Sequence, residues 1–387
     1  MKRYVLTPLA IALAGLTGAA HAQSSVTLYG IIDAGIGYVH NADGNRKQVG
    51  MINGNMNGNR WGIKGSEDLG GGLKAVFQLE SGFDPGTGRL NQGGREFGRQ
   101  AFVGLTSDKY GTVTLGRQYD PLVDMAQGIT GDNFFGGIFA TPGDVDNYDN
   151  SLRTSNAVKY VSPTYAGFQV EGLYGFSNGA GTTGQGQTWS GAATYNNGPV
   201  SLAAGYFYAN NPTANRTTGW NSASSDSLFN SPVNNGYSSA HSIGIARVAG
   251  QYVFGSATVG LSYSNARYSP DGKSGFSETE KYNIGNVFAA YQLTPALLVG
   301  AGYTYMKASG DTSASYHQAS LGADYALSKR TDFYAMAAYQ HASGTQSVYN
   351  ATTGRRTTQA AQASIGSYGY AGTSQQEIAI VGIRHKF

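Results

Sequence analysis

Charged side chains are the residues of this sequence best suited to chemistry, and one group of them is unusual. Six aspartates lie between Asp120 and Leu152, in a segment that contains no Lys, Arg or His: Asp120, Asp124, Asp132, Asp144, Asp146 and Asp149. This segment, called here the acidic loop, also lacks the alternation of a strand. Because long connections without secondary structure are uncommon in compact domains and usually functional, we expect it to serve the protein's activity.

Motifs with a catalytic spelling are each better explained in another way. Gly175-Phe-Ser177-Asn-Gly179 matches a nucleophile elbow, but the residues that follow form a loop rather than the required helix. Gly272-Lys-Ser274 resembles the end of a phosphate loop, although Arg267 stands where its first glycine should be. The chain has no cysteine, and its six histidines show no metal-ligand spacing. We therefore expect neither an enzyme nor a cofactor.

The aspartates of the acidic loop could also bind a cation. Asp144-Val-Asp146-Asn-Tyr-Asp149 has the close spacing of calcium ligands, but the glycine and the distal glutamate of a calcium loop are missing. A negatively charged lining is the better interpretation, and calcium binding stays open.

Basic residues on alternating segments indicate what these acids could face. Arg60 and Lys64 share a phase with Gly62, opposite Trp61 and Ile63, so both are expected to face an aqueous interior. Arg153 lies where the acidic loop rejoins a strand.

The direction of Arg99 depends on the phase of the strand that follows it. It points inward if Phe102 faces outward, which would also place three apolar residues inside: Ala101, Val103 and Leu105. Such a wall conflicts with a wet interior unless the acidic loop covers it with its own apolar cluster: Phe134, Phe135, Ile138 and Phe139.

Facing acids and bases would produce a transverse electric field across a narrow aperture, and rings of charged side chains set ion selectivity. The aperture residues expected on this basis are Arg60, Arg99, Arg153, Asp124 and Asp132, with Lys64 and Asp120 lining the passage nearby. The alternative is a set of solvated charges far from any constriction.

Arg117 departs from the pattern because it shares a face with Val113 and Leu115. Against lipid, an arginine near the midplane would cost about 2–4 kcal/mol. Either a subunit interface or inward packing beneath the acidic loop would avoid that cost.

The elements that must position these residues are strands. In 200–208, 297–305 and 319–327, apolar or aromatic residues alternate with small or polar ones. This period of two indicates one face in an apolar medium and one in a polar medium. The apolar face carries Ala, Val and Leu with Tyr toward the ends, as in a lipid-facing band bounded by aromatic girdles rather than a soluble sandwich.

The connections alternate in length. Short turns lie at 68–72, 108–111, 162–167, 196–199, 254–256, 293–295 and 328–330, and longer segments lie near 40–57, 84–95, 120–152, 178–187, 210–240, 270–281, 308–316 and 343–375. Together they join sixteen strands, and the last, 378–387, would pair with the first to remove both sheet edges. We predict an all-β fold: a 16-stranded antiparallel transmembrane barrel with an inward-folded constriction loop.

The first 22 residues have the parts of a secretory signal. Lys2 and Arg3 precede an apolar run from Val5 to Leu16, and small residues follow at 20–22. We expect residues 1–22 to be removed and residues 23–387 to form the outer-membrane barrel. A net charge of +3 argues against a nucleic-acid partner.

Several stretches resemble the general porins of Gram-negative bacteria, in the branch of Neisseria, Bordetella and Burkholderia relatives. They are SSVTLYGIIDAGIGY, NRWGIKGSEDLGGGLKAVFQLESGF, FGRQAFVGLTSDKYGTVTLGRQYD, SNAVKYVSPTYAGF and the ending VGIRHKF. The resemblance implies a homotrimer in which the third external loop folds into each pore. By motif position, Arg60, Arg99 and Arg153 match the family's basic cluster at the constriction.

The expected function is passive diffusion of ions and small hydrophilic solutes across the outer membrane of a Gram-negative bacterium, with outer-membrane lipid and lipopolysaccharide as further partners. One alternative is a channel specific for sugars, oligosaccharides or peptides, which would show an aromatic slide along the lumen. A second is a secreted β-rich adhesin or lectin. Because loop acids and wall arginines compete, the preference between cations and anions stays open.

Overall fold

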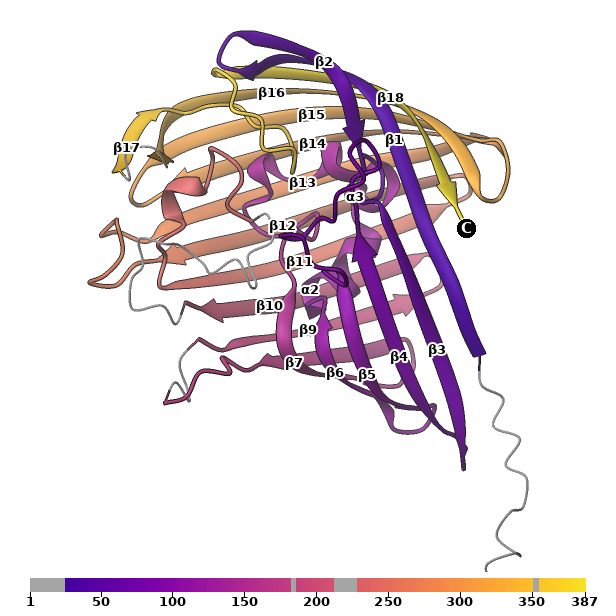
Figure 1. Ribbon diagram of the computed structural model, residues 1–387. Coiled ribbons are helices and arrows are strands. Elements are labelled where there is room, and N and C mark those ends of the chain that lie inside the picture. Colours follow the sequence, from indigo (N-terminus) through magenta and orange to yellow (C-terminus); the bar gives the residue numbers. More distant parts are fainter. Residues whose placement is uncertain (1–24, 182–185, 212–227, 351–354) are drawn as a thin grey trace, which may run out of the picture.

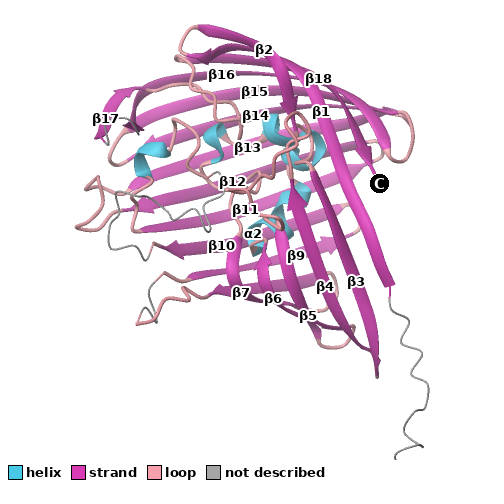
Figure 2. Ribbon diagram, in the orientation of Figure 1, coloured by secondary structure: helices cyan, strands magenta, loops and turns pink. Residues whose placement is uncertain are grey.

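The strands of this protein form one antiparallel sheet that closes on itself (Figures 1 and 2). The computed structural model describes residues 25–181, 186–211, 228–350 and 355–387. The expected signal segment, residues 1–22, therefore lies outside the described residues.

The strands follow in chain order. They are β1 (Ser25–Asp43), β2 (Arg46–Asn53), β3 (Arg60–Gly70), β4 (Leu73–Gly82), β5 (Gln100–Ser107), β6 (Gly111–Gln118), β7 (Thr154–Val161), β8 (Phe168–Gly175), β9 (Thr188–Asn197), β10 (Val200–Asn210), β11 (Ser242–Phe254), β12 (Ala257–Ser269), β13 (Glu280–Thr294), β14 (Leu297–Ser309), β15 (Ser313–Ala326), β16 (Thr331–Asn350), β17 (Arg355–Ala360) and β18 (Gln375–Lys386).

Closure depends on β1, which pairs with β3 along its first half and with β18 along its second. β2 and β3 both pair with β1, and β17 and β18 both pair with β16, so each of these two pairs occupies a single position in the wall and the barrel has 16 strands, as predicted. Gly30 and Phe387 exchange two backbone hydrogen bonds, of 3.0 and 3.1 Å, at the seam. The seam closes the wall, and in the described part of the chain only β2 and β17 pair with a single neighbouring strand.

Short turns at one end of the barrel alternate with longer connections at the other, as expected. Three expected long segments contain much strand, however. The segment 40–57 contains the end of β1 and all of β2. The segment 308–316 contains only a three-residue turn, because β14 runs to Ser309 and β15 begins at Ser313. The segment 343–375 contains the end of β16 and all of β17. A strand that extends beyond the apolar band has water on both of its faces, so polar residues can continue its backbone hydrogen-bond ladder. Composition alone therefore does not mark where a strand ends.

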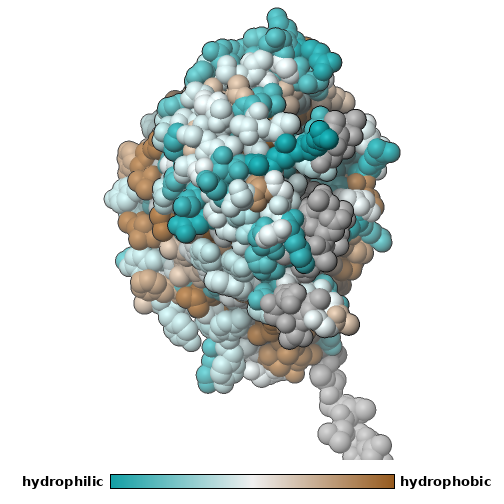
Figure 3. Space-filling view, turned by 90° about the vertical axis from the view of Figure 1, so that its left-hand side faces the viewer, coloured by the Kyte–Doolittle hydropathy of each residue, from teal (hydrophilic) through white to brown (hydrophobic). Residues whose placement is uncertain are grey.

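The outer face carries the predicted apolar band. Its exposed residues include Leu202, Val248, Leu261, Val287 and Leu321. Aromatic side chains bound it toward the long connections at Trp189, Tyr206, Tyr263, Tyr303 and Tyr339, and toward the short turns at Tyr252, Tyr291, Tyr325, Phe333 and Phe387. Figure 3 looks onto the end with the long connections, where hydrophilic residues predominate and brown hydrophobic ones gather along the sides. Within the described ranges, no helix is long and apolar enough to span a bilayer.

Strand β5 presents the opposite faces to those expected for an inward-pointing Arg99. Phe102 pairs with the inward Gln78, and three residues expected inside face outward: Ala101, Val103 and Leu105. Val103 is 58% exposed, so the prediction of an apolar inner wall here is wrong. Arg99 precedes the strand and is buried, which means that strand alternation does not decide its direction.

Arg117 also lies on an outward phase, beside the exposed Val113 and Leu115, so packing beneath the acidic loop does not explain it. Its guanidinium is nevertheless buried. It donates hydrogen bonds of 2.7 Å to the carbonyl of Gly98, which precedes β5, and to Oγ of Ser155, near the start of β7.

The acidic loop lies inside the barrel and, contrary to expectation, contains short helices. They are α2 (Pro121–Ala126), α3 (Gly131–Phe135) and the 3-10 segments Gln127–Ile129, Gly136–Phe139 and Pro142–Asp144; another 3-10 turn, Asn235–Tyr237, precedes β11. Asp120 caps α2 by accepting the Leu122 amide at 2.9 Å, and Pro121 takes the first helical position. Figure 2 shows these helices within the ring of strands.

The apolar cluster of the acidic loop packs on the wall formed by β13–β16. A Cβ at Gly300 or Gly322 would lie 2.2 or 2.3 Å from the Phe135 ring, and one at Gly302 would lie 2.8 Å from Phe139. The small residues on the inner phase of these strands therefore form sockets for the phenylalanines. Gln318 and Ser320 complete the contact by donating to the Ile138 carbonyl at 2.9 and 2.6 Å.

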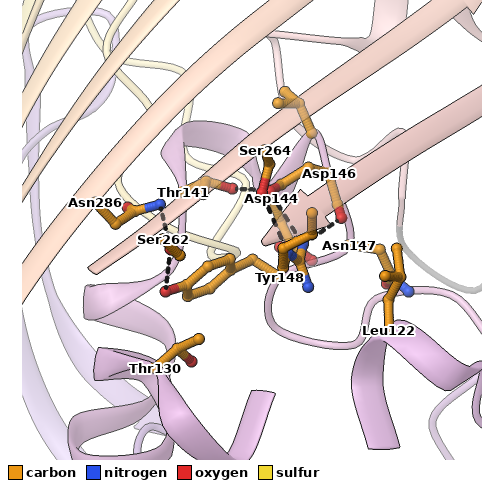
Figure 4. Close-up of polar contacts among 12 residues, drawn as sticks. Leu122, Thr130, Thr141, Asp144, Asp146, Asn147, Tyr148, Ser262, Ser264 and Asn286 are labelled. Atoms are coloured by element: carbon orange, nitrogen blue, oxygen red, sulfur yellow. Dashed lines mark hydrogen bonds and ion pairs between the residues drawn. The ribbon is translucent and has the colours of Figure 1, made fainter. Parts of the chain in front are cut away.

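A buried ion pair holds the second half of the acidic loop. Arg247 on β11 donates to an Asp146 carboxylate oxygen at 3.0 Å and to its carbonyl at 2.7 Å, and both side chains are fully buried. The Arg247 guanidinium also lies 4.8 Å from the centre of the Tyr148 ring. In Figure 4, Tyr148 reaches Ser262 on the wall while Thr141 binds Asp146 from within the loop.

Replacing Arg247 by Met tests this anchor. The Asp146 carboxylate would stay buried without its partner, and we expect the free energy of unfolding to fall by about 3–5 kcal/mol. Denaturant unfolding followed by tryptophan fluorescence would measure the change. The double variant Arg247→Met/Asp146→Leu should lose less, because no buried charge remains.

Arg46→Met is the matched control, because Arg46 pairs with Asp43 where both side chains are exposed. Its effect should stay below about 1 kcal/mol. Equal losses for Arg247→Met and Arg46→Met would contradict an anchoring role.

Candidate functional site

A polar cavity of about 270 Å³ lies between the acidic loop and the wall near β3. Three arginines line it from the wall side: Arg60, Arg99 and Arg153. Asp132 and Asp149 of the acidic loop line it from the other side. The remaining lining residues are Gly54, Met56, Asn57, Gly58, Gln92, Tyr119, Gln127, Asn133, Asn150, Ser151 and Ser367. Sequence segments far apart in the chain thus converge on one opening.

The three arginines share a position in the fold, at or just before the first residue of a strand. Arg60 begins β3, Arg99 directly precedes β5, and Arg153 directly precedes β7. These three strands enter the wall from the end with the long connections, so their first residues lie at one level. Antiparallel alternation therefore brings the guanidinium groups together although the first and the last are 93 positions apart in the sequence.

A hydrogen-bonded group around Tyr119 fixes the direction of the arginines. Arg99 donates to Glu80 Oε1 and to the Tyr119 hydroxyl, each at 2.7 Å, and Tyr119 donates to the same carboxylate at 2.8 Å. The guanidinium groups of Arg99 and Arg153 each lie 5.6 Å from the Tyr119 ring centre. Arg60 donates to the Gly58 carbonyl at 2.9 Å. Glu80 thus offsets one of the three positive charges.

Of the carboxyl groups opposite them, that of Asp132 is buried and that of Asp149 is partly buried, and the two interact. Gln127 donates to Asp132 at 2.6 Å, and Ser367 donates to Asp149. Burial raises the pKa of Asp132 well above its ordinary value, and the negative charge of Asp149 raises it further. Burial likewise raises the pKa of Asp149, with the Ser367 hydrogen bond acting against the shift. Burial, followed by the charges of Asp149 and Asp146, raises the pKa of Asp144 to about 8.

Two of the aspartates expected at the passage lie elsewhere. Asp124 binds Lys159 of β7, whose ammonium group also lies 3.2 Å from Glu171 of β8. Asp120 is 1% exposed, and its carboxylate caps α2 and accepts a hydrogen bond from Asn147 at 2.9 Å. Neither lines the cavity, because each carboxylate satisfies a helix or a wall lysine instead.

Lys64 faces the lumen on the same phase of β3 as Arg60, but it lies nearer the short turns. Its ammonium group is 5.2 Å from the Tyr29 ring centre. It lines a separate, more open space together with Gln78, Thr114 and Lys159. Lys64 thus points inward, as its phase indicates, but it does not line the arginine cavity.

Sequence reasoning did not identify three residues that shape this site: Glu80, Tyr119 and Asp149. Glu80 could have been found, because it shares a phase with Gln78 on a strand that pairs with β3. Asp149 was counted among the acids, but only the fold of the loop brings it beside Asp132. Within the described ranges, no three His, Asp or Glu side chains converge as they would around a metal ion.

Comparison with known proteins agrees with this architecture. Residues 9–345 match the family model described as Gram-negative porin. The chain is 35% identical to an outer membrane porin protein of Bordetella pertussis, covering 88% of this chain and 94% of that protein. It is also 28% identical to a major outer membrane protein P.IB of Neisseria gonorrhoeae, covering 84% of this chain and 90% of the relative.

Solved structures give the same result. An anion-selective porin from Comamonas acidovorans superposes with a TM-score of 0.71 at 25% identity, covering 94% of this chain and all of that one. The trimer form of the outer membrane protein OmpT of Vibrio cholerae superposes with a TM-score of 0.64 at 17% identity, covering 94% of this chain and 99% of that one. The chain therefore belongs to the Gram-negative porin family and forms a diffusion channel in the outer membrane.

Proposed function

We propose that this porin is a general diffusion channel that passes anions in preference to cations. The observation that supports it is the lining of the cavity, where three guanidinium groups meet two carboxyl groups of raised pKa. Arginine remains charged at all physiological pH values. A raised pKa lowers the ionised fraction of a carboxyl group relative to an ordinary aspartate, which favours the positive side of the aperture.

The immediate surroundings favour the same sign of net charge. Glu80 offsets Arg99 through a direct ion pair, whereas Arg60 donates only to a backbone carbonyl. A small anion in the cavity would thus meet donors that its own charge complements. The superposition with a porin described as anion-selective further supports this proposal.

Arg60→Gln tests the preference with little risk to folding, because the Arg99–Glu80 pair stays in place. Loss of one unit charge about 4 Å from a passing ion changes its energy by about 1 kcal/mol in water. We expect the permeability ratio of chloride to potassium to fall about fivefold, as measured by reversal potential in a planar bilayer under a salt gradient. Arg330→Gln, in the exposed turn before β16, is the control. An unchanged ratio for Arg60→Gln would refute the proposed role.

The raised pKa values also predict a pH dependence. A carboxyl group with a raised pKa ionises at a higher pH than an ordinary aspartate. Asp144, whose pKa is raised to about 8, should gain charge as the pH rises from about 7 to 9, and Asp132 and Asp149 should also ionise above the usual range of an aspartate. The anion preference should therefore decline over this interval. Reversal potentials recorded across it would measure the decline. The variant Asp132→Asn/Asp149→Asn should flatten the profile, and a profile identical to wild type would count against these groups.

We further propose that the barrel assembles as a homotrimer through the face formed by β1, β16 and β18. This outer face carries an apolar groove of about 700 Å³ in which small residues would allow a close approach: Ala34, Ala323, Ala335 and Gly382. The Vibrio cholerae structure described as a trimer form supports the proposal.

Ala335→Arg should disrupt this assembly, with loss of the high-mass band of unheated protein on a detergent gel. Ala289→Arg is a matched control, since Ala289 is also an exposed alanine of a wall strand but lies on β13. Equal behaviour of the two variants would contradict the choice of face.

A further inference from the structure

Three cations lie together on the outer wall of the barrel, on strands β12, β13 and β14. They are Arg267, Lys281 and Lys307, called here the outer cation cluster. The strand register places Arg267 directly opposite Lys281, and Lys281 directly opposite Ser309. Lys307 is two residues from Ser309, so it is the diagonal neighbour of Lys281. Such neighbours have Cβ atoms about 5 to 8 Å apart.

All three side chains point away from the lumen. Arg267 shares its phase with the exposed Tyr263, Lys281 with the exposed Val287, and Lys307 with the exposed Tyr305. The sequence neighbour of each cation has the opposite phase, points inward and is buried: Tyr268, Tyr282 and Met306. The outer cation cluster therefore belongs to the surface that faces the membrane and its headgroups, and not to the pore.

No acid compensates these charges in the part of the chain that the structure describes. No carboxylate lies within 4 Å of any of the three groups there, and their hydrogen-bond partners are neutral. Arg267 donates to Asn265 at 2.7 Å, and Lys307 donates to Ser313 at 3.1 Å and to Ser315 at 3.3 Å. Two inward arginines of the strands differ, since Arg247 and Arg384 both bind carboxylates. Like charges placed directly opposite on two strands are destabilising unless something else neutralises them.

The position of the outer cation cluster relative to the membrane indicates which anionic partner neutralises it. Tyr263, Tyr303 and Tyr305 lie next to it on the side of the apolar band, and such tyrosines mark the membrane–water interface. Asn283, Ser309 and Ser313 surround it with further hydrogen-bond donors. A partner that fits has phosphate oxygens at the level of the cations and hydrocarbon along Val287 and Leu261 below.

We propose that the outer cation cluster binds the phosphate of an anionic lipid in the outer leaflet, whose acyl chains lie on the apolar band beneath the tyrosines. The site depends on the outer-membrane placement of the barrel and not on the charges of the pore. A free phosphate ion would satisfy the cations but would leave the adjoining apolar surface without a role, so the lipid is the occupant that both parts of the surface fit.

Lipid A, which carries phosphates on a multiply acylated sugar, is the probe for this site. Refolded full-length barrel in neutral detergent would be titrated with lipid A, and bound lipid would be counted by native mass spectrometry. We expect Arg267→Gln/Lys281→Gln/Lys307→Gln to bind at least about tenfold more weakly than wild type. The control triple variant Lys109→Gln/Lys329→Gln/Arg330→Gln removes the same charge from exposed short turns and should bind as wild type does.

Two further ligands test whether the site requires both the phosphate and the acyl chains. Uncharged diacylglycerol should not bind at the site, and inorganic phosphate at the same phosphate concentration should not displace lipid A. Binding of lipid A should weaken as salt rises, which keeps a test available in wild-type protein. Equal lipid A binding by the two triple variants would overturn the proposal. Displacement of lipid A by inorganic phosphate would overturn the lipid as the specific occupant.

Discussion

A backbone amide or carbonyl that faces hydrocarbon has no water to bond, and this constraint underlies every other feature of the structure. A sheet meets it only by closing, so the pairing of β1 with β18 is the contact on which the barrel depends. A closed wall of 16 strands is too wide to be filled by its own side chains. The space inside must therefore hold water, a folded segment of the chain, or both.

The acidic loop occupies much of that space, and its position follows from small and charged residues of the wall. Gly300, Gly302 and Gly322 admit the rings of Phe135 and Phe139, while Arg247 neutralises Asp146. Both contacts fail if the loop moves by a few ångströms, because glycine sockets and buried ion pairs have exact geometry. The remaining opening lies beside β3, where Arg60, Arg99 and Arg153 face Asp132 and Asp149, whose pKa values are raised by burial.

The two groups of cations in this barrel illustrate how surroundings determine the role of a charge. Those pointing inward are held by carboxylates, tyrosines and carbonyls, so they define an aperture of fixed shape. Those of the outer cation cluster have neutral neighbours within the described residues and point toward the membrane interface. Strand alternation separates the two groups, because adjacent residues on one strand serve entirely different media.

The sequence by itself determined the class of fold, the strand count and the existence of a distinct acidic loop. Those features depend on alternation and on turn residues, which are local, and Arg60 and Lys64 could be directed inward on the same basis. It did not determine the direction of Arg99, which precedes its strand. It also did not determine which face of β5 points inward, because both phases of that strand contain apolar residues. Only the tertiary structure placed Asp124 on Lys159, Asp120 at a helix cap and Asp149 beside Asp132. Which acids meet which bases depends on how the loop packs against strands distant in sequence, and no local pattern encodes that packing.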